Sequence, residues 1–264
     1  MQILLTNDDG IYAPGLAAME RQLQRLGHVT VVAPLTEQSG VGHSITYLTP
    51  LMAREVFDER RDRRGWAVEG SPADCVKLAI TELCPRRPDL VVSGINGGQN
   101  AGINVLYSGT VAAAIEGAFF GITSIAVSLE FDDDARYDLA AQQAATIIEQ
   151  ILAQEQILAQ EEAEPQLYNL NIPTAALDGP AEVRVVPAAT APWGEDFEKR
   201  LDPRGRAYYW ATGLQPDPPS DEETDLRSLR AGHITLTPLK FDMNRRDKLQ
   251  QMKSWQLGQL EQTR

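Results

Sequence analysis

Short buried strands alternate with helices from Met1 to about Leu129, and this alternation constrains the fold more than any other feature. Apolar runs typical of buried strands occupy Gln2–Thr6, His28–Ala33, Leu90–Ser93 and Ser124–Leu129. Helical patterns lie between them, at Gly15–Leu26, Pro72–Cys84 and Ser108–Phe120. Strands separated by helices form βαβ units, so the sequence predicts an α/β fold with a mainly parallel sheet.

The second half of the chain has a different pattern. One long helix is predicted from an apolar stripe that includes Ala140, Ile147 and Leu158, and it should end before Pro165. Short β-like runs follow at Leu167–Ile172, Glu182–Val186, Ala207–Trp210 and His233–Thr237, and a last amphipathic helix at Arg245–Leu260. We expect a core over residues 1–166 and a β-rich elaboration over 167–264 that completes this core. Its hairpins and terminal helix could be exchanged between subunits.

The charge balance narrows the class of partner. The chain has 24 basic and 37 acidic residues, a net charge of −13, which argues against long nucleic acid or an anionic membrane as a partner. A small phosphorylated ligand stays compatible with this charge if a metal ion and backbone amides screen it.

Cys75 and Cys84 should lie on opposite faces of one helix, so a disulfide is disfavoured. With no secretory leader or transmembrane stretch recognisable, a cytoplasmic location is expected.

Two adjacent carboxylates follow the first predicted strand. Asp8 and Asp9 come directly after Gln2–Thr6, and Gly10 permits a tight turn behind them. Ligands of open α/β sheets gather at the carboxyl ends of the strands, and two neighbouring acids there repel each other. A hard divalent cation such as Mg²⁺ or Mn²⁺ would offset this repulsion. The alternative is a turn whose acids cap the next helix and face water, and both interpretations remain open.

Three further segments fall at the same predicted edge of the sheet. Ser39 and Asn96 lie in loops after two other strands, and they supply neutral oxygens that could complete a partial oxygen cage with the acids. Ser108-Gly109-Thr110 opens an Ala-rich helix, where unpaired amides and a partial positive charge favour an anion such as phosphate. An ordinary Ser N-cap on a core helix is the alternative for this segment.

Several other chemistries are disfavoured. His28 and His233 have no ligand-like spacing with each other or with the cysteines, which argues against zinc. The Gly97-Gly98 loop lacks a dinucleotide glycine pattern, and a Walker sequence does not occur. The Asp-x-Asp pattern of aspartyl-phosphate phosphatases is missing as well. His43, in a glycine-rich loop, is expected to be hydrogen-bonded or solvent-facing rather than a phosphate contact.

Taken together, these segments resemble the SurE (survival protein E) family of metal-dependent nucleotidases. The matching stretches are Thr6–Gly10, Gln38-Ser39, Gly70–Val76, Ser93–Gly102, Tyr107–Thr110, Asn169–Pro173, Thr224-Asp225 and Thr235–Leu239. They cover nearly the whole chain. Three departures are visible: Ser71 where Thr is usual, Asp242-Met243-Asn244 near the end, and a long Ile151–Gln166 extension.

The resemblance implies a Rossmann-like three-layer core and one divalent cation per subunit, Mg²⁺ or Mn²⁺. It implies hydrolysis of nucleoside 5′-monophosphates, with 3′-monophosphates left open, and assembly as a homodimer or homotetramer. It assigns the metal-ligand role to Asp8, Asp9, Ser39 and Asn96. It gives phosphate contact to Ser108, Gly109 and Thr110, with Asn96 as a further substrate contact.

The resulting hypothesis makes Asp8 and Asp9 catalytic, because one of them would orient the attacking water beside the cation. The sequence does not say which. Two alternatives differ in class. One is a phosphatase acting mainly on polyphosphate or non-nucleotide esters, and the other is a non-catalytic sensor that binds a phosphorylated ligand in the same pocket.

Overall fold

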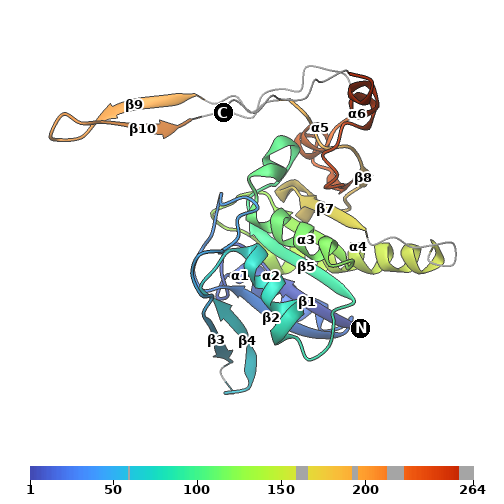
Figure 1. The fold of residues 1–264 in the computed structure, drawn as a ribbon. Helices are drawn as coiled ribbons and strands as arrows, with labels where there is room; N and C mark the ends of the chain where they lie inside the picture. The colour runs from blue at the N-terminus through green and yellow to red at the C-terminus, as the bar shows by residue number, and fades with distance from the viewer. Residues whose placement is uncertain (59, 159–165, 192–195, 213–222, 256–264) are drawn as a thin grey trace, which may run out of the picture.

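A nine-stranded sheet organises the molecule (Figure 1). This computed structural model describes residues 1–58, 60–158, 166–191, 196–212 and 223–255. The strand order is β3-β4-β2-β1-β5-β6-β7-β11-β8, and the run from β4 to β7 is parallel throughout. Only β3 against β4 and β7 against β11 pair antiparallel among the described strands of this sheet. The predicted α/β class with a mainly parallel sheet is confirmed.

The strands that form the first half of the sheet are β1 (Gln2–Thr6), β2 (His28–Pro34), β3 (Ala53–Phe57), β4 (Arg63–Val68), β5 (Leu90–Gly97) and β6 (Thr123–Leu129). Side chains of β1 alternate between the two faces, as the period of a strand requires. Ile3 and Leu5 join one core cluster, and Leu4 joins another on the opposite face. The central strand is therefore apolar on both faces, which explains its uninterrupted hydrophobic sequence.

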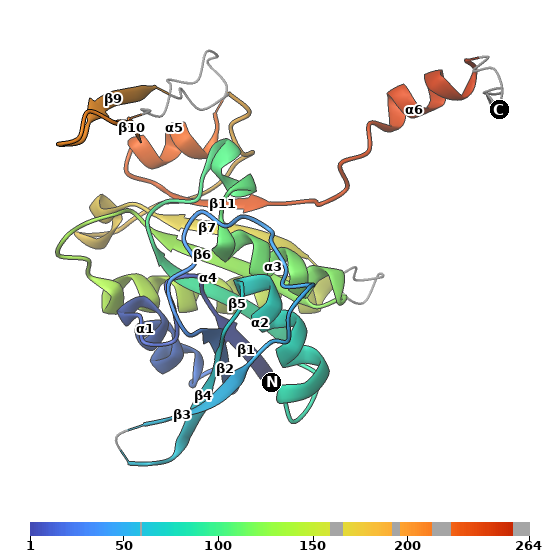
Figure 2. The ribbon, with the colours of Figure 1, turned by 60° about the vertical axis from the view of Figure 1, so that its left-hand side comes forward.

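Helices cover both faces of the sheet and complete three layers. Helix α1 (Pro14–Leu23) packs against α4 (Tyr137–Leu158) on one face, and α2 (Pro72–Leu78) packs against α3 (Gly109–Phe119) on the other (Figure 2). Helix α2 continues into a short π-helical turn, Ala79–Leu83. Most residues of α3 are buried, so its first turn is held rigidly against the sheet edge.

The direction in which successive strands are added to the sheet changes between β1 and β5. From β1 the chain moves outward through β2 to β4, and it then returns to start β5 on the other side of β1. Ligands of open α/β sheets bind beyond the carboxyl ends of the strands at such a switch point. The ends of β1 and β5 are where the proposed acids and Asn96 occur in the sequence.

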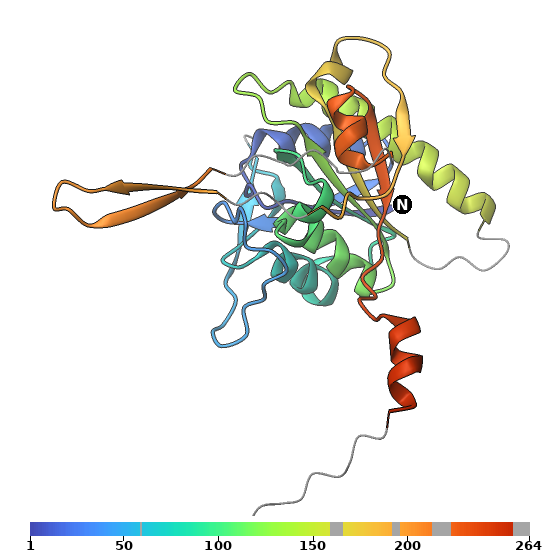
Figure 3. The ribbon, with the colours of Figure 1, turned by 90° about the horizontal axis from the view of Figure 1, so that it is seen from above.

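The C-terminal part adds strands to the same sheet and two projecting features. Strands β7 (Leu167–Ile172), β11 (Ile234–Pro238) and β8 (Val183–Val185) extend the sheet past β6. The hairpin β9–β10 (Phe197–Leu201 and Ala207–Ala211) projects away from this body, and α6 (Arg246–Lys253) lies on an outlying arm (Figures 2 and 3). The division at residue 166 into a core and an elaboration stays a prediction.

Some expected elements differ from the observed ones. The charged run Asp58–Gly65 has the composition of a solvated hairpin tip or loop. Strands β3 and β4 do form an antiparallel pair around it, but β4 already begins at Arg63, because Arg63 pairs with Phe57 of β3. Sequence patterns also missed β9 and the short helix α5 (Asp225–Arg230). The predicted last helix matches α6 up to Lys253, and its expected continuation from residue 256 lies outside the described residues. Residues 159–165, part of the Ile151–Gln166 extension, also lie outside them.

Two bulk expectations can be compared with the structure. Cys75 and Cys84 are both free thiols, as the helix geometry predicted. Across the part of the chain that the structure describes, no helix is both long and apolar enough to cross a membrane.

Candidate active site

The turn after β1 presents the two acids. Asn7 closes the turn, because its side chain donates to the Gly10 carbonyl (3.0 Å) and accepts from the Gly10 N–H (3.2 Å). Gly10 has φ +103°, a conformation that favours glycine. Asn7 therefore stabilises the turn, and the carboxylates of Asp8 and Asp9 are available for other contacts.

The capping alternative for these acids is wrong. Helix α1 has Ala13 at its N-cap and no side-chain cap hydrogen bond. Asp8 is only 4 % exposed, so it does not face water. Its side chain instead meets the first turn of α3, where the Thr110 hydroxyl donates to Asp8 Oδ1 at 2.5 Å. A buried carboxylate placed against a helix N-terminus is favoured by the helix dipole.

Gly109 permits this close approach. A Cβ atom at position 109 would lie 2.9 Å from Asp8 Cβ, 3.1 Å from Asp8 Oδ2 and 3.1 Å from Pro72 Cγ. The lack of a side chain therefore lets β1, α2 and α3 converge at one point. The group that approaches the backbone of Gly109 is Asp8.

Electrostatics oppose the ionisation of both acids. Burial raises the pKa of Asp8, although hydrogen bonds from Thr110 partly lower it. Burial and the neighbouring Asp8 charge together raise the pKa of Asp9 to about 6, against a hydrogen bond from the Gly97 N–H at 3.2 Å. Glu37, which sequence analysis did not single out, adds a further repulsive charge that raises the pKa of each. A cation placed here would relieve all three repulsions.

Asn96 lies where the sequence expected it, but on a strand and not in a loop. Strand β5 continues past Ser93 to Gly97, with an irregular register between Ser93 and Asn96. The Asn96 amide nitrogen donates to the Gly98 carbonyl at 2.6 Å. This bond engages the NH₂ end of the amide, so the carbonyl oxygen is the end suited to a cation. The neighbouring Gly97 N–H binds Asp9, which ties the β5 end to the acids.

Ser39 is exposed, and its hydroxyl donates to Glu37 Oε1 at 2.6 Å. The loop itself is anchored beside the acids, because the Gln38 N–H donates to the Asp8 carbonyl at 2.8 Å. Further along, the Gly42 N–H donates to the Tyr107 carbonyl at 3.0 Å. The structure thus brings the Ser39 loop between β1 and α3, with the Ser39 hydroxyl turned toward Glu37.

The first turn of α3 has two different tasks. Ser108 is the N-cap, and its hydroxyl accepts from the Val111 N–H at 3.1 Å, so the capping interpretation is confirmed for this residue. The Thr110 hydroxyl is engaged by Asp8. The Gly109 N–H belongs to the first residues of the helix, whose amides have no intrahelical acceptor. It is the donor that this turn can direct toward an anion.

A cluster that the sequence did not predict lies one helical turn beyond. Glu116 of α3 is 3 % exposed, and its two carboxylate oxygens contact Lys77 Nζ and His43 Nε2, each at 2.8 Å. Burial opposes the ionisation of Glu116, but the hydrogen bonds from His43 and Lys77 outweigh it and lower its pKa. His43 is therefore hydrogen-bonded, as expected. The signal available in the sequence was a lone acid inside an otherwise apolar helix.

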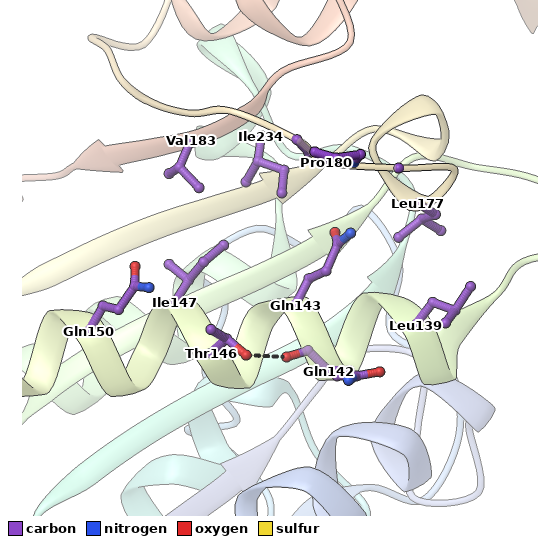
Figure 4. Close-up of a pocket in the computed structure, with 12 residues that line it drawn as sticks. Leu139, Gln142, Gln143, Thr146, Ile147, Gln150, Leu177, Pro180, Val183 and Ile234 are labelled. Carbon is purple, nitrogen blue, oxygen red and sulfur yellow. Dashed lines mark hydrogen bonds between the residues drawn. The ribbon is translucent and has the colours of Figure 1, made fainter.

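Two hollows are candidates for a ligand site. One, of about 490 Å³, runs along α3 from Ser108 to Phe119. Another, of about 450 Å³, lies between α4 and the segment that leads into β8, where Gln143 points toward Pro180 and Ile147 toward Ile234 (Figure 4). The second hollow is lined by amides and apolar groups and by neither Asp8 nor Asp9. It lies outside the site described here.

The donor chemistry defines the class of site. Within the described residues, no three His, Cys, Asp or Glu side chains are grouped so that they could hold a metal ion. A cation at Asp8 and Asp9 would therefore depend on neutral oxygens such as those of Asn96 and Ser39. Paired acids, neutral oxygens and a helix N-terminus at a switch point form an oxygen-rich site of the kind that serves hard cations and phosphate groups.

Comparison with known proteins identifies the family. Residues 3–195 match the family model described as Survival protein SurE. A protein of Rhodopirellula baltica named 5′-nucleotidase SurE is 59% identical over 260 residues, covering 97% of this chain and 99% of that protein. One of the same name from Heliobacterium modesticaldum is 41% identical over 256 residues, covering 97% and 92%. The chain belongs to the SurE family.

A solved structure supports the same conclusion for the fold. The crystal structure of the SurE protein from Aquifex aeolicus is 34% identical, with a TM-score of 0.80. The match covers 96% of this chain and 98% of that one. The three-layer, mainly parallel architecture is thus the Rossmann-like fold that the sequence resemblance implied.

Proposed function

We propose that the protein is a divalent-metal-dependent 5′-nucleotidase, which hydrolyses nucleoside 5′-monophosphates to nucleoside and phosphate. Relatives that share 41% and 59% of its residues over nearly the full length are named for this activity. The single structural observation that supports it best is the burial of Asp8 against the first turn of α3, with Asp9 beside it. Whether 3′-monophosphates are also substrates is a question for the same assay.

The residues present fit one Mg²⁺ or Mn²⁺ per subunit. Asp8, Asp9, the Asn96 amide oxygen and the Ser39 hydroxyl are all oxygen donors, which both ions prefer. Burial, and to a smaller extent neighbouring negative charge, raises the pKa of both acids, and a bound cation would offset this penalty. Ser39 would join the set by turning its hydroxyl away from Glu37. When bound, such a cation supplies a Lewis acid next to the phosphoryl group.

The chain's own residues have distinct roles in this proposal. Thr110 holds Asp8 in one orientation, so Asp8 acts as a fixed ligand. Asp9 is less buried, and its carboxylate can accept a hydrogen bond from the attacking water and orient it in line with the ester oxygen. The water oxygen bonds to phosphorus as the phosphorus–ester oxygen bond breaks; the attacking water releases one proton to solvent, and the leaving nucleoside oxygen takes one up from solvent. The Gly109 N–H and the Ser108 hydroxyl donate to the phosphoryl oxygens as their charge grows.

Phosphate release from AMP with added Mn²⁺ or Mg²⁺ tests this function. We expect turnover that a chelator abolishes and that Asp9→Asn lowers at least about 100-fold. Asp132→Asn is the matched control, because Asp132 is an exposed acid outside the site. Saturable AMP binding without turnover would instead identify a sensor. Faster hydrolysis of polyphosphate or non-nucleotide esters than of any nucleotide would identify the other phosphatase.

Assembly as a homodimer or homotetramer through the C-terminal part belongs to the same proposal. Every residue of β9 and β10 is exposed, including Phe197, Tyr209 and Trp210, each between 58% and 60%. An isolated two-stranded hairpin is marginally stable in water, so a projecting apolar hairpin needs a partner surface. A second copy of the chain would supply that surface. Residues 167–264 would then act as the elaboration through which subunits associate.

We also place the protein in the cytoplasm. Cys75 and Cys84 are free, which fits a reducing compartment. The net charge of −13 fits a small nucleotide as partner better than nucleic acid or a membrane surface.

A further inference from the structure

A cavity of about 490 Å³ begins at the phosphate-facing end of α3. Ser108, Ala112, Ile115 and Phe119 line it at helical spacing, so they form one face of α3 along the length of the cavity. Gly109 and Thr110 face Asp8 from the neighbouring side of the same first turn. Ser108 is thus the residue that the cavity lining shares with the proposed phosphate site, and the cavity starts beside that site.

Aromatic rings close the far end of this cavity. The rings of His43 and Phe119 are stacked, with centroids 5.6 Å apart and planes at 18°. Phe241, from the arm after β11, meets Phe119 edge-on at 4.5 Å. All three residues line the cavity. A flat ring is the ligand group that such an aromatic wall binds best, and stacking tolerates every base because each has a π face.

His43 provides a polar group that is held in one position by its contact with Glu116. Glu116 is buried and ionised, and it accepts from His43 Nε2 at 2.8 Å. This contact assigns the ring proton to Nε2 and leaves Nδ1 for a ligand. A mostly apolar cavity with a few fixed polar groups, in this size range, is typical of a small-molecule site.

We propose that this cavity along α3 binds the nucleobase of the substrate, with the aromatic wall of His43, Phe119 and Phe241 as the surface against which the base packs and His43 as a specificity-determining residue. The proposal rests on the proposed function, because it takes the phosphate to lie at the first turn of α3. A ligand anchored there by its phosphate can extend only along neighbouring surfaces, and the α3 face leads from that turn to the aromatic wall. The sequence showed none of this, because the wall combines residues from three distant segments.

A cavity-filling variant separates the base from the phosphate. Ile115→Trp places a large side chain in the middle of the cavity, and Leu139→Trp places the same side chain in the hollow of Figure 4 as a matched control. The measured quantity is kcat/KM for AMP divided by kcat/KM for ribose 5-phosphate, which lacks the base. We expect Ile115→Trp to lower this ratio at least tenfold, mainly through KM for AMP, and Leu139→Trp to leave it within twofold.

A second pair of variants tests the stacking surface and does not depend on the Trp variant folding. Phe119→Leu keeps an apolar side chain and removes the ring, and Phe131→Leu makes the same change at an exposed ring outside the cavity. We expect Phe119→Leu to raise KM for AMP several-fold with little change in kcat, and Phe131→Leu to leave KM for AMP within twofold. Equal loss on both substrates, or no change in the ratio for either Ile115→Trp or Phe119→Leu, would overturn the proposal.

Two other outcomes are distinguishable. If Asp9→Asn left AMP hydrolysis intact, the proposed function would fail, whatever the cavity variants did. If Ile115→Trp changed the oligomeric mass in light scattering and left the substrate ratio unchanged, the cavity would be a contact between subunits, and the nucleobase proposal would be wrong.

Discussion

Gly109→Ala is the substitution that most directly tests how the site is built. The new Cβ would lie 2.9 Å from Asp8 Cβ, whereas ordinary contacts begin near 3.4 Å, so the groups must separate by about 0.5 Å. The neighbours cannot easily yield, since Asp8 is held by Thr110 and Pro72 begins α2. Overpacking of this kind costs about 1–3 kcal/mol. A gain of up to about 1 kcal/mol from helix propensity offsets part of it, leaving a loss of about 0–2 kcal/mol.

The same displacement should lower the activity. Catalytic groups must be held within about 0.5 Å of their productive positions, and a displacement of about 1 Å can cost 100-fold. We therefore expect kcat/KM for AMP to fall roughly tenfold or more, with a loss of up to about 2 kcal/mol in the free energy of unfolding. Gly179→Ala is the control, because a Cβ there would meet no atom within 4 Å. Wild-type kcat/KM in Gly109→Ala would refute the argument that Asp8 is positioned by contact with α3.

Three further predictions concern the buried ion pair, the cation and the hairpin. Glu116→Gln should destabilise the protein at pH 7 by about 2 kcal/mol, because Lys77 and His43 lose a charged acceptor. The pKa of Glu116 is lowered in the folded state, so its stabilisation is present above the unfolded value of 4.5 and is lost as pH falls through the folded value. The free energies of unfolding of wild type and Glu116→Gln should therefore converge at acid pH. A difference that stayed constant with pH would contradict this direction. Mn²⁺ at about 100 times its dissociation constant should stabilise the wild type by about 2.7 kcal/mol in urea denaturation, and equal stabilisation of Asp9→Asn would argue against the assigned ligands. Trp210→Glu should lower the oligomeric mass measured by light scattering, while Lys199→Gln, an exposed position on the partner strand of the same hairpin, should not. An unchanged mass in Trp210→Glu would separate the hairpin from assembly.

The order of strands and helices could be read from the sequence because each core element carries its own pattern. Strand β7 was predicted with its observed bounds, and α2 and α3 were placed within a few residues. The start of β4 was misplaced because its first residues, Arg63 and Arg64, look solvated. Arg63 pairs with Phe57 of β3, and the pairing with the distant strand β2 begins only at Gly65. Strand β9 was missed for the related reason that its side chains are all exposed and show no buried face.

The candidate site was predictable in its members and not in their contacts. Parallel strands end at the same edge, so Asp8, Asp9 and Asn96 could be brought together from topology alone. The hydrogen-bond acceptor of each hydroxyl could not be predicted in this way. Thr110 was assigned to phosphate but donates to Asp8, and Ser39 was assigned to the cation but donates to Glu37. Both outcomes depend on angstrom-scale distances between segments far apart in the chain, which a motif does not encode.

These two hydroxyl contacts suggest how the site tolerates its own charge. Asp8 uses hydrogen bonds from Thr110, and part of the positive end of α3, to keep a buried carboxylate in place. Asp9 has a weaker partner in the Gly97 N–H, and its pKa is raised to about 6 by burial and by Asp8. The acid with the poorer support is thus the one whose ionisation would respond most to an added cation, and it is also the less buried. Because of this difference, Asp9 is a better candidate than Asp8 to orient the attacking water. Thr110→Val should disturb the placement of Asp8 and weaken Mn²⁺ binding. Asp9→Asn should remove turnover even at saturating Mn²⁺. Full turnover of Asp9→Asn at saturating metal would exchange the two roles.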